Sequence, residues 1–503
     1  MHRTAQQTAF IDALLSTTAN LALVARAGCG KTTTILEAVD EYARKFPQAE
    51  ITVCCFGKGI QKEIAEKLTL RGHTDWKRVQ ASTTHSMGMG LVKFAFCPKG
   101  KTNFVDNKKV FNLINAKNHP TFSTYGAQIA KLVSLAKGEG FGFFSDVQIG
   151  DARAWYAMAA HYDVNDFDDT SDMDKVIEAA QQIYRESLQK TDTIDYADMI
   201  LFPLVKNLRV KFQRDLIFVD EAQDTSRARR ALIKKFVKTG GRIVVVGDDR
   251  QAIMGFAGAS ADALTEFTSE LNAITLPLNV TWRCPKAVVK QAQRLVPDIE
   301  AATGAPDGEV MHLPAMPEAF NPTDAILCRN VAPLVEQAYA LIRQGVACKV
   351  EGREIGTGLL RMVDRWSRIT TIAAYLTKLE DYEARESQKA VAKGLDAKVE
   401  EIKDRCDTLR TICRAVQDKK QHDLDDVRAF INAMFADDVS KAGMLTLCTA
   451  HKSKGREWPR VFLLEYSKRC PSPYAKQEWA LRQEYNLMYV MITRAQETLV
   501  FIG

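Results

Sequence analysis

Two closely spaced glycines, followed by a lysine and a threonine, stand near the start of the sequence. They come directly after the apolar run Leu21–Ala25, although Ala25 replaces the first glycine of the usual pattern. In such a loop the backbone N–H groups close around phosphates, the lysine reaches the β- and γ-phosphates, and the threonine hydroxyl binds Mg²⁺. A strand before the loop and a helix after it predict a phosphate-binding loop; a chance Gly-Lys-Thr is the alternative. The residues expected around the phosphates are Ala27, Gly28, Cys29, Gly30, Lys31, Thr32 and Thr33.

A second candidate is a pair of adjacent carboxylates, Asp220 and Glu221, within the segment VDEAQD. They end an apolar run of strand length, and ligands of open α/β sheets bind at the carboxyl ends of the strands. Asp220 is expected to hold Mg²⁺, directly or through water. Glu221 is expected to orient and deprotonate an attacking water. An exposed acidic turn is the alternative interpretation. It is disfavoured if Asp220 and Glu221 follow a strand of the same sheet as Lys31.

Apolar runs of strand length alternate with helical patterns, which predicts parallel sheets with helices on both faces. Helical periodicity alone fills two long stretches, about Leu91–Lys190 and about Leu360–Phe435. The predicted fold class is therefore α/β, with two parallel-sheet cores that are each interrupted by a mainly helical insertion. The first core is expected over 1–90 and 191–273 with its insertion at 91–190, and the second over 274–359 and 441–503 with its insertion at 360–440.

The strands of this prediction follow from short β-rich runs bounded by polar or glycine-containing segments. One of them, Val79–Gly88, is interpreted as a strand followed by a turn. The others are Leu21–Ala25, Ile51–Phe56, Asp215–Asp220, Arg242–Asp249, Ala325–Cys328, Val346–Gly352, Met444–Ala450, Arg460–Glu465 and Leu499–Ile502.

The composition is that of a globular protein, with 46% hydrophobic and 26% charged residues among 503. A net charge of +6 permits nucleic-acid binding without arguing for it. The 11 cysteines form no CxxC pair or zinc-spaced cluster, which favours reduced thiols in a cytoplasmic compartment. No signal-like leader and no apolar run of about 18 residues is present, so neither secretion nor membrane insertion is expected.

The acidic pair and the segment Gly247–Ala259 (GDDRQAIMGFAGA) resemble motifs II and III of the UvrD/Rep/PcrA-type superfamily 1 helicases. Other segments resemble further family motifs in the right order along nearly the whole chain. They are FGKGIQKEI (56–64) for motif Ia, TTHSMG (83–88) for Ib, IDYADMI (194–200), TWRCP (281–285) for IV, TAHKSKGREW (449–458) for V and EYNLMYVMITRA (484–495) for VI. The resemblance implies two RecA-like cores of the P-loop NTPase class, 1A and 2A, with insertions 1B and 2B.

The resemblance also implies roles at the nucleotide. Gln7, or its neighbour Gln6, corresponds to the glutamine that recognises adenine, and Gln251 is expected to hydrogen-bond the γ-phosphate. Arg283 and Arg494 are expected to stabilise the charge on the transferred phosphoryl group, since such arginines are worth roughly 10³–10⁵ in rate. Trp282 is expected to stack on adenine, with core packing as the alternative, and Glu457 is expected to contact the sugar. Thr33 stands where relatives often have an arginine.

For nucleic acid, the family motifs imply a surface of aromatic, basic and polar side chains, because aromatics stack on bases of any sequence while lysines contact phosphates. Met254, Ala257 and Gly57 depart from residues common in relatives. The basic clusters Arg227–Lys235 and Lys419–His422 are interpreted as solvated helix faces. The expected nucleic-acid contacts are Phe56, Lys58, Thr84, His85, Phe256 and His451.

The function implied by the resemblance is that of an ATP- and Mg²⁺-dependent helicase that moves 3′ to 5′ on single-stranded DNA and separates the duplex ahead of it. The expected partners are single-stranded DNA and its junctions with duplex, and the chain is expected to act as a monomer. One alternative is a translocase that strips proteins or remodels recombination filaments with little unwinding, since the second insertion is short. Another is a non-hydrolytic, ATP-gated binding module.

Overall fold

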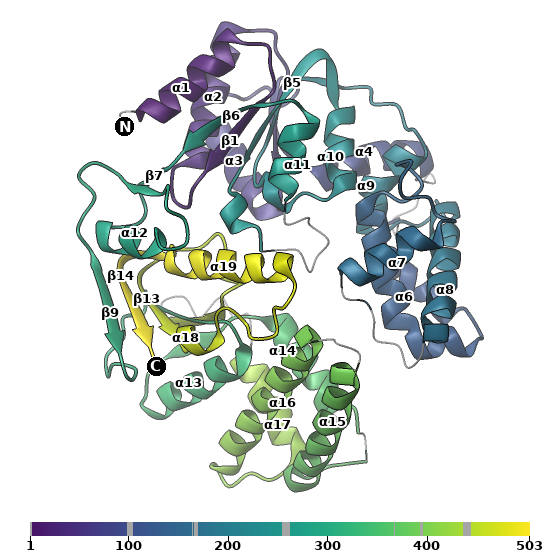
Figure 1. Ribbon diagram of the computed structural model, residues 1–503, viewed down its shortest axis with the longest axis vertical. Helices are drawn as coiled ribbons and strands as arrows, with labels where there is room; N and C mark the ends of the chain where they lie inside the picture. The colour runs from purple at the N-terminus through teal and green to yellow at the C-terminus, as the bar shows by residue number, and fades with distance from the viewer. Residues whose placement is uncertain are drawn as a thin grey trace. The chain divides into compact units, whose positions relative to one another are not determined.

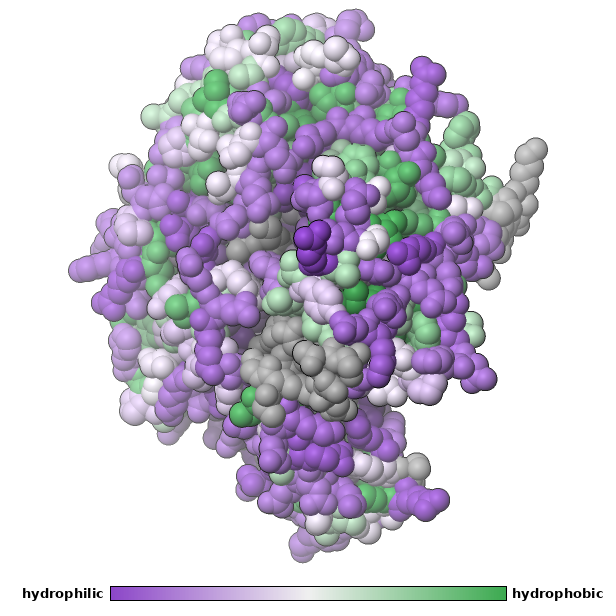
Figure 2. Space-filling model, turned by 45° about the vertical axis from the view of Figure 1, so that its right-hand side comes forward, coloured by the Kyte–Doolittle hydropathy of each residue, from purple (hydrophilic) through white to green (hydrophobic). Residues whose placement is uncertain are grey.

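The computed structural model describes residues 3–97, 104–162, 164, 170–253, 262–366, 368–392, 396–435 and 444–503. The chain divides into two compact units, Met1–Asn279 and Val280–Gly503, and Figure 1 shows that each contains a sheet covered by helices. Among the described residues, no helix is long and apolar enough to cross a membrane. Hydrophilic residues form most of the face shown in Figure 2, and hydrophobic ones lie among them in small groups.

The first unit contains a six-stranded, all-parallel sheet in the order β3-β2-β4-β5-β1-β6. Its central strands are nearly continuous apolar runs because helices cover both faces there, whereas the edge strand over Ile274–Leu278 is largely exposed. In the centre of the sheet β4, β5 and β1 are neighbours, so their carboxyl ends meet at one edge. The strands are β1 (Leu21–Ala25), β2 (Ile51–Cys55), β3 (Val79–Thr83), β4 (Arg214–Val219), β5 (Val237–Gly247) and β6 (Ile274–Leu278).

Eleven α-helices are described in this unit. Those between β3 and β4 surround a hydrophobic core of their own that includes Ile129, Trp155 and Tyr184, and the described part of 84–213 contains no named strand. The helices are α1 (Ala5–Ser16), α2 (Lys31–Lys45), α3 (Lys58–Leu70), α4 (Thr84–Phe96), α5 (Lys109–Asn115), α6 (Pro120–Glu139), α7 (Ala152–His161), α8 (Thr170–Gln189), α9 (Tyr196–Val205), α10 (Arg227–Lys235) and α11 (Ala263–Glu270), with short 3₁₀ turns η1 (Ala222–Asp224) and η2 (Asp249–Gln251).

The second unit also contains a six-stranded parallel sheet, in the order β11-β12-β10-β13-β14-β9, and a separate pair β7-β8. The strands are β7 (Val280–Thr281), β8 (Glu300–Ala301), β9 (Glu309–Leu313), β10 (Ala325–Cys328), β11 (Cys348–Val350), β12 (Leu445–Thr449), β13 (Trp458–Leu464) and β14 (Ala495–Ile502). The helices are α12 (Lys286–Ala292), α13 (Val331–Arg343), α14 (Arg353–Val363), α15 (Ile372–Ala392), α16 (Asp396–Gln417), α17 (Leu424–Met434), α18 (Tyr466–Arg469) and α19 (Glu478–Ile492).

Helices α14 to α17 lie between β11 and β12 in the chain and share one hydrophobic core with the second sheet. Ile326 of β10, Leu409 of α16 and Leu447 of β12 belong to that cluster. The Asp404 carboxylate on α16 accepts hydrogen bonds from the N–H groups of Val331 and Ala332 and so caps α13. These helices therefore extend the core of the sheet.

The structure corrects two sequence-based predictions. The second core was expected to begin at 274, but β6 pairs with β1 over Leu21–Ala25 and belongs to the first sheet, which completes its unit at Asn279. The segment after β3 was expected to be a turn, but Thr83 accepts a hydrogen bond from the N–H of Ser86 and caps α4. The helix therefore begins at Thr84.

Candidate active site

The phosphate-loop residues connect β1 to α2. Gly28 and Gly30 have φ values of 71° and 75°, a left-handed conformation that glycine adopts at little cost. Gly30 ends the loop, and Lys31 is the first residue of the 15-residue helix α2. The first N–H groups of such a helix have no partner within the helix and face outward, so they form a binding site for anions.

Lys31 lies beside the two carboxylates that follow β4. Its Nζ is 2.9 Å from Oε1 of Glu221. Burial by itself would lower the pKa of Lys31, but Glu221, Asp248 and Asp220 together raise it above its ordinary value. Burial, together with the neighbouring Glu221, raises the pKa of Asp220. The sequence-predicted lysine and acidic pair therefore meet at one edge of the sheet, and the alternative of an exposed acidic turn is wrong.

Glu221 has a left-handed backbone, with φ 51° and ψ 45°. This conformation is costly for a non-glycine residue and is found most often at functional sites. Gln223 holds the side chain in place, since its Nε2 donates to Oε2 of Glu221 at 2.5 Å. The Oε1 of Gln223 accepts from the N–H of Asp248 at 3.1 Å. A Cβ on Gly247 would collide with that oxygen and lie 3.3 Å from the backbone nitrogen of Ala222. Glycine at 247 therefore lets the two segments approach closely.

Gln251 lies in η2, just beyond β5, and belongs to the same polar network. Its Nε2 donates to Oδ2 of Asp248 at 2.7 Å. The other carboxylate oxygen of Asp248 accepts from Nη1 of Arg26 at 3.1 Å, and that nitrogen also contacts Asp249 at 2.6 Å. The segments after β1, β4 and β5 are thus joined through side chains.

The structure distinguishes between the two glutamines of α1. Gln7 is buried, its Oε1 accepts from the N–H of Thr4, and its Nε2 donates to Oγ1 of Thr34 at 2.9 Å. Gln7 therefore closes a capping box and ties α1 to α2. Gln6 is half-buried, and its Oε1 accepts from the N–H of Asn279 at 2.8 Å. Of the two side chains, Gln6 is the one nearer the surface.

The second unit carries the remaining residues expected at the nucleotide. The Arg283 side chain pairs with Glu457, which also accepts from Nε2 of Gln496 at 3.0 Å. Arg494 is buried, and its Nε and Nη1 donate to the carbonyl oxygens of Val490 and Arg456 at 2.8 and 3.0 Å. Burial and the nearby Arg283 lower the pKa of Arg494 to about 9. Two guanidinium groups so close together favour an anion beside them.

Trp282 is 57% exposed, so the alternative of core packing is wrong for it. It immediately precedes Arg283, at the end of the short pair β7-β8. An exposed indole next to an arginine can take an aromatic base on its face.

Phe56 and Lys58 lie where β2 meets α3, and both are exposed. The guanidinium of Arg229, on α10, lies 4.9 Å from the centre of the Phe56 ring, a cation–π contact. Arg229 was expected on a solvated helix face. The structure instead places it beside Phe56, one of the residues expected to contact nucleic acid.

His85 and Thr84 begin α4, next to the end of β2. Burial and the nearby Arg229 lower the pKa of His85 to about 4, so its ring is neutral near pH 7. Tyr196, at the start of α9, is 56% exposed, and its ring meets that of His85 edge-on at 6.1 Å. The Thr84 hydroxyl is buried 3.4 Å from Sγ of Cys54, so its side chain is not offered to a ligand. Tyr196 was not among the residues expected from the sequence, although it lies in the segment 194–200 that resembles a family motif.

His451 follows β12 in the second unit, and burial with the nearby Arg329 lowers its pKa to about 3. A neutral ring can stack or share a hydrogen bond but cannot pair ionically with phosphate. Phe256, Met254 and Ala257 lie outside the described residues.

The basic helix α10 is not a solvated face, because its arginines have separate partners. Arg227 forms two hydrogen bonds with Asp146 at 2.7 and 2.9 Å, and its guanidinium lies 3.9 Å from the ring centre of Phe144. Arg230 is buried and pairs with Glu266 and Glu270. The other cluster, Lys419–His422, is largely exposed, as expected.

Comparison with known proteins gives two family matches. Residues 4–272 match the UvrD/REP helicase N-terminal domain, and residues 139–503 match the UvrD-like helicase C-terminal domain. The ATP-dependent DNA helicase Rep of Escherichia coli is 23% identical over 289 residues, 54% of this chain and 40% of Rep.

Two further relatives match over shorter stretches. DNA helicase II of Haemophilus influenzae is 29% identical over 143 residues, 27% of this chain and 19% of its own. The ATP-dependent DNA helicase PcrA of Bacillus subtilis is 30% identical over 131 residues, 24% of this chain and 18% of PcrA. In each of these three comparisons the match spans less than half the relative's length.

Proposed function

Because the chain belongs to the UvrD/REP helicase family, we propose that it is an ATP-dependent DNA helicase that moves 3′ to 5′ on single-stranded DNA and separates the duplex ahead of it. One observation carries this proposal. The carboxyl ends of β1, β4 and β5 bring together a phosphate loop with Lys31, the acidic pair and Gln251. This is the set of groups that phosphoryl transfer to water requires.

Lys31 and Glu221 explain how hydrolysis would begin. Glu221 pairs with the ammonium group of Lys31. The γ-phosphate of ATP would compete with the Glu221 carboxylate for that same ammonium group. On binding of ATP, Lys31 pairs with the phosphates and Glu221 becomes available to take a proton from water. The hydrogen bond from Gln223 would keep the Glu221 carboxylate oriented toward that water. The backbone strain at Glu221 is consistent with a side chain held for a chemical purpose.

The donor set around the acidic pair fits Mg²⁺. Among the described residues, no group of three or more acidic, cysteine or histidine side chains is arranged to hold a metal ion by itself. Mg²⁺ at nucleotide sites is held by one or two carboxylates together with phosphate oxygens, so such a cage is not needed. We assign the ion to Asp220 and Thr32, and when bound it would neutralise charge on the phosphates.

The second unit would supply the remaining contacts to the nucleotide. We assign Arg283 and Arg494 to the charge that accumulates on the transferred phosphoryl group, Trp282 to a face of the adenine, and Glu457 to the sugar. Gln6 is the better candidate for recognition of the adenine edge, since both the oxygen and the nitrogen of the Gln7 amide are bonded inside the protein, whereas the bond between Gln6 and Asn279 uses the amide oxygen. Hydrolysis that needs residues from both units would couple chemistry to domain motion.

For single-stranded DNA we assign Phe56, Lys58, His85, Tyr196 and Arg229 to one surface of the first unit. Their aromatic rings would stack on bases and their cations would contact phosphates. The chain would act as a monomer. None of its eleven cysteines, all of which lie among the described residues, forms a disulfide, which suits the reducing cytoplasm.

The decisive test measures ATPase activity and strand displacement by the full chain. We expect hydrolysis to be stimulated by single-stranded DNA and to be lost in Lys31→Ala and Glu221→Gln. Displacement of a labelled strand should occur from 3′-tailed but not from 5′-tailed duplex. Stimulated hydrolysis without displacement from either tail would favour the protein-stripping translocase. Absence of stimulated hydrolysis would favour an ATP-gated binding module.

A further inference from the structure

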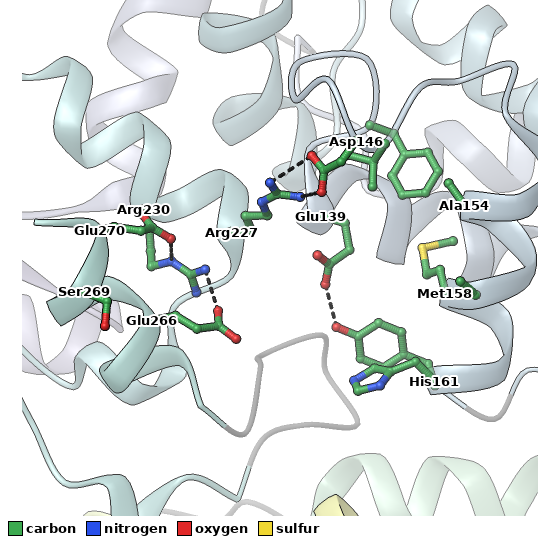
Figure 3. A pocket seen from close by; sticks show the side chains of 14 residues that line it. Glu139, Asp146, Ala154, Met158, His161, Arg227, Arg230, Glu266, Ser269 and Glu270 are labelled. Carbon is green, nitrogen blue, oxygen red and sulfur yellow. Dashed lines mark hydrogen bonds and ion pairs between the residues drawn. The ribbon is translucent and has the colours of Figure 1, made fainter.

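A pocket of about 680 Å³ lies within the first unit, between α6 and α7 on one side and α10 and α11 on the other. Figure 3 shows Arg230, Glu266, Ser269 and Glu270 along one wall, facing Ala154, Met158 and His161 across the opening. Its size is that of a pocket for a small molecule or a short peptide segment. None of the residues assigned to the nucleotide or to DNA lines it.

The lining of this pocket is acidic with an apolar floor. Four carboxylates contribute to it, those of Glu139, Asp146, Glu266 and Glu270, against the guanidinium groups of Arg227 and Arg230. Apolar surface comes from residues on α7 and the segment before it, namely Phe141, Val147, Ala154, Ala157 and Met158. Lys234 also pairs with Glu270, at 2.7 Å, so the four carboxylates exceed the neighbouring cations by one. This excess of negative charge repels phosphate and attracts a cation.

Arg230 adds an unfilled hydrogen-bonding position to the pocket wall. The residue is only 3% exposed; its Nε donates to Glu270 at 3.0 Å and its Nη2 to Glu266 at 2.7 Å. Among the described residues, nothing accepts a hydrogen bond from its Nη1, which is buried. A buried donor without an acceptor costs about 1–3 kcal/mol, so an oxygen from a ligand would be stabilising there.

We propose that this pocket binds a segment of a partner protein that presents a lysine or arginine side chain. The aliphatic stem of such a side chain fits the apolar floor while its cation meets the carboxylates. A backbone carbonyl of the same segment supplies the acceptor for Nη1 of Arg230. Nucleic acid has no such cationic side chain, and its phosphates carry the negative charge that the pocket carboxylates repel.

The helix α10 separates this pocket from the candidate DNA surface. Arg229 contacts Phe56 of that surface, whereas its neighbour Arg230 lines the pocket. A partner segment could therefore bind while DNA is bound. Binding of such a segment does not require the helicase activity.

The test uses dye-labelled pentapeptides GLXLG that differ only in the central residue, titrated with the full chain up to millimolar concentration. The peptides with central arginine and lysine should bind at least about tenfold tighter than those with aspartate or glutamate, a difference of about 1.4 kcal/mol. Absence of binding by every peptide, or binding without preference for a basic residue, would overturn the proposal.

Two variants of α7 locate the binding. Ala157 and Ala160 are both exposed on this helix, but only Ala157 lines the pocket. Ala157→Trp should weaken the arginine peptide about tenfold by filling the pocket, and Ala160→Trp should not. Equal affinities of the two variants, or loss of oligo-dT binding in Ala157→Trp alone, would contradict the assignment.

A charge variant serves if Ala157→Trp fails to fold. Glu139 accepts a hydrogen bond from the Tyr162 hydroxyl at 2.6 Å, and Glu139→Gln preserves an oxygen for that bond while removing the charge. The arginine peptide should bind several-fold more weakly to this variant, with the ATPase rate unchanged. Unchanged peptide affinity would mean that the carboxylates do not recognise the cation.

Discussion

Trp282 exposes more than half of its side chain, so its indole ring contributes little to the folded core. Trp282→Ala should change the free energy of unfolding by no more than about 0.5 kcal/mol. It should weaken ATP binding about tenfold, because stacking of a base on an aromatic ring is worth ~1–3 kcal/mol. Urea unfolding and nucleotide titration measure the two effects.

Trp282→Phe is the matched control, since a smaller ring still stacks. It should retain most of the ATP affinity that Trp282→Ala loses. A large loss of stability in Trp282→Ala would show that the indole packs in the protein, and unchanged affinity would remove Trp282 from the site.

His85 provides a test of stability against pH. Its folded pKa is about 4, whereas an unfolded histidine has a pKa of about 6.5. Between about pH 6.5 and about pH 4, His85 is therefore protonated in the unfolded chain but neutral in the folded chain. Because protonation stabilises only the unfolded chain in this range, His85 lowers the free energy of unfolding as the pH falls from about 6.5 to about 4. His85→Gln removes this contribution. Relative to wild type, the variant's urea midpoint should rise as the pH falls from 7.5 to 5.

The exposed His422 is the control for this measurement. His422→Gln should shift the midpoint equally little at both pH values. A His85→Gln variant that differs from wild type by the same amount at pH 7.5 and pH 5 would contradict burial of a neutral ring.

At the scale of elements, α5, α6 and α9 are joined by a buried ionic cluster. Asp198, at the start of α9, contacts Nζ of Lys109 at 2.6 Å and of Lys137 at 2.7 Å. Lys137 also contacts Asp195, the N-cap of α9, at 2.6 Å. Since the Asp198, Lys109 and Lys137 side chains are almost fully buried, each cation depends on its carboxylates.

Asp198→Asn should destabilise the protein by about 3 kcal/mol or more, because two buried ammonium groups lose a charged partner. Urea unfolding measures the loss. The exposed pair of Lys67 and Glu63, at 2.6 Å, is the control, and Lys67→Ala should cost less than about 1 kcal/mol. Equal effects of the two substitutions would show that the buried cluster does not hold these helices together.

At the scale of the whole molecule, the proposed cycle needs residues from both units. Arg283→Ala should lower kcat for ATP by roughly 10³-fold or more, with nucleotide affinity retained, since such arginines act on the transition state. Arg283 suits this test better than Arg494, whose burial and bonds to backbone carbonyls give it a structural role as well. Single-turnover hydrolysis separates binding from chemistry.

Arg343 provides a control for the loss of a guanidinium group. It is exposed and 3.7 Å from Asp418, and Arg343→Ala should leave kcat unchanged. Full activity of Arg283→Ala would mean that hydrolysis is completed within the first unit, and the proposed coupling between units would be wrong.

The sequence by itself determined the fold class and the meeting of Lys31 with Glu221. Strands of a buried parallel sheet appear in the sequence as continuous apolar runs. Residues that follow neighbouring parallel strands must lie at one edge of the sheet. The pattern placed β6 in the wrong unit, because a strand that ends one sheet looks the same as a strand that begins another. Pairing with β1 depends on contacts more than 240 residues apart in the chain.

Only the tertiary structure decided how individual polar side chains are used. Gln6 and Gln7 are chemically identical neighbours, and only packing against Thr34 buries the second. Arg229 and Arg230 are likewise adjacent, yet one contacts Phe56 and the other lines an acidic pocket. Successive residues of a helix point in directions about 100° apart, so their partners depend on which elements pack around it.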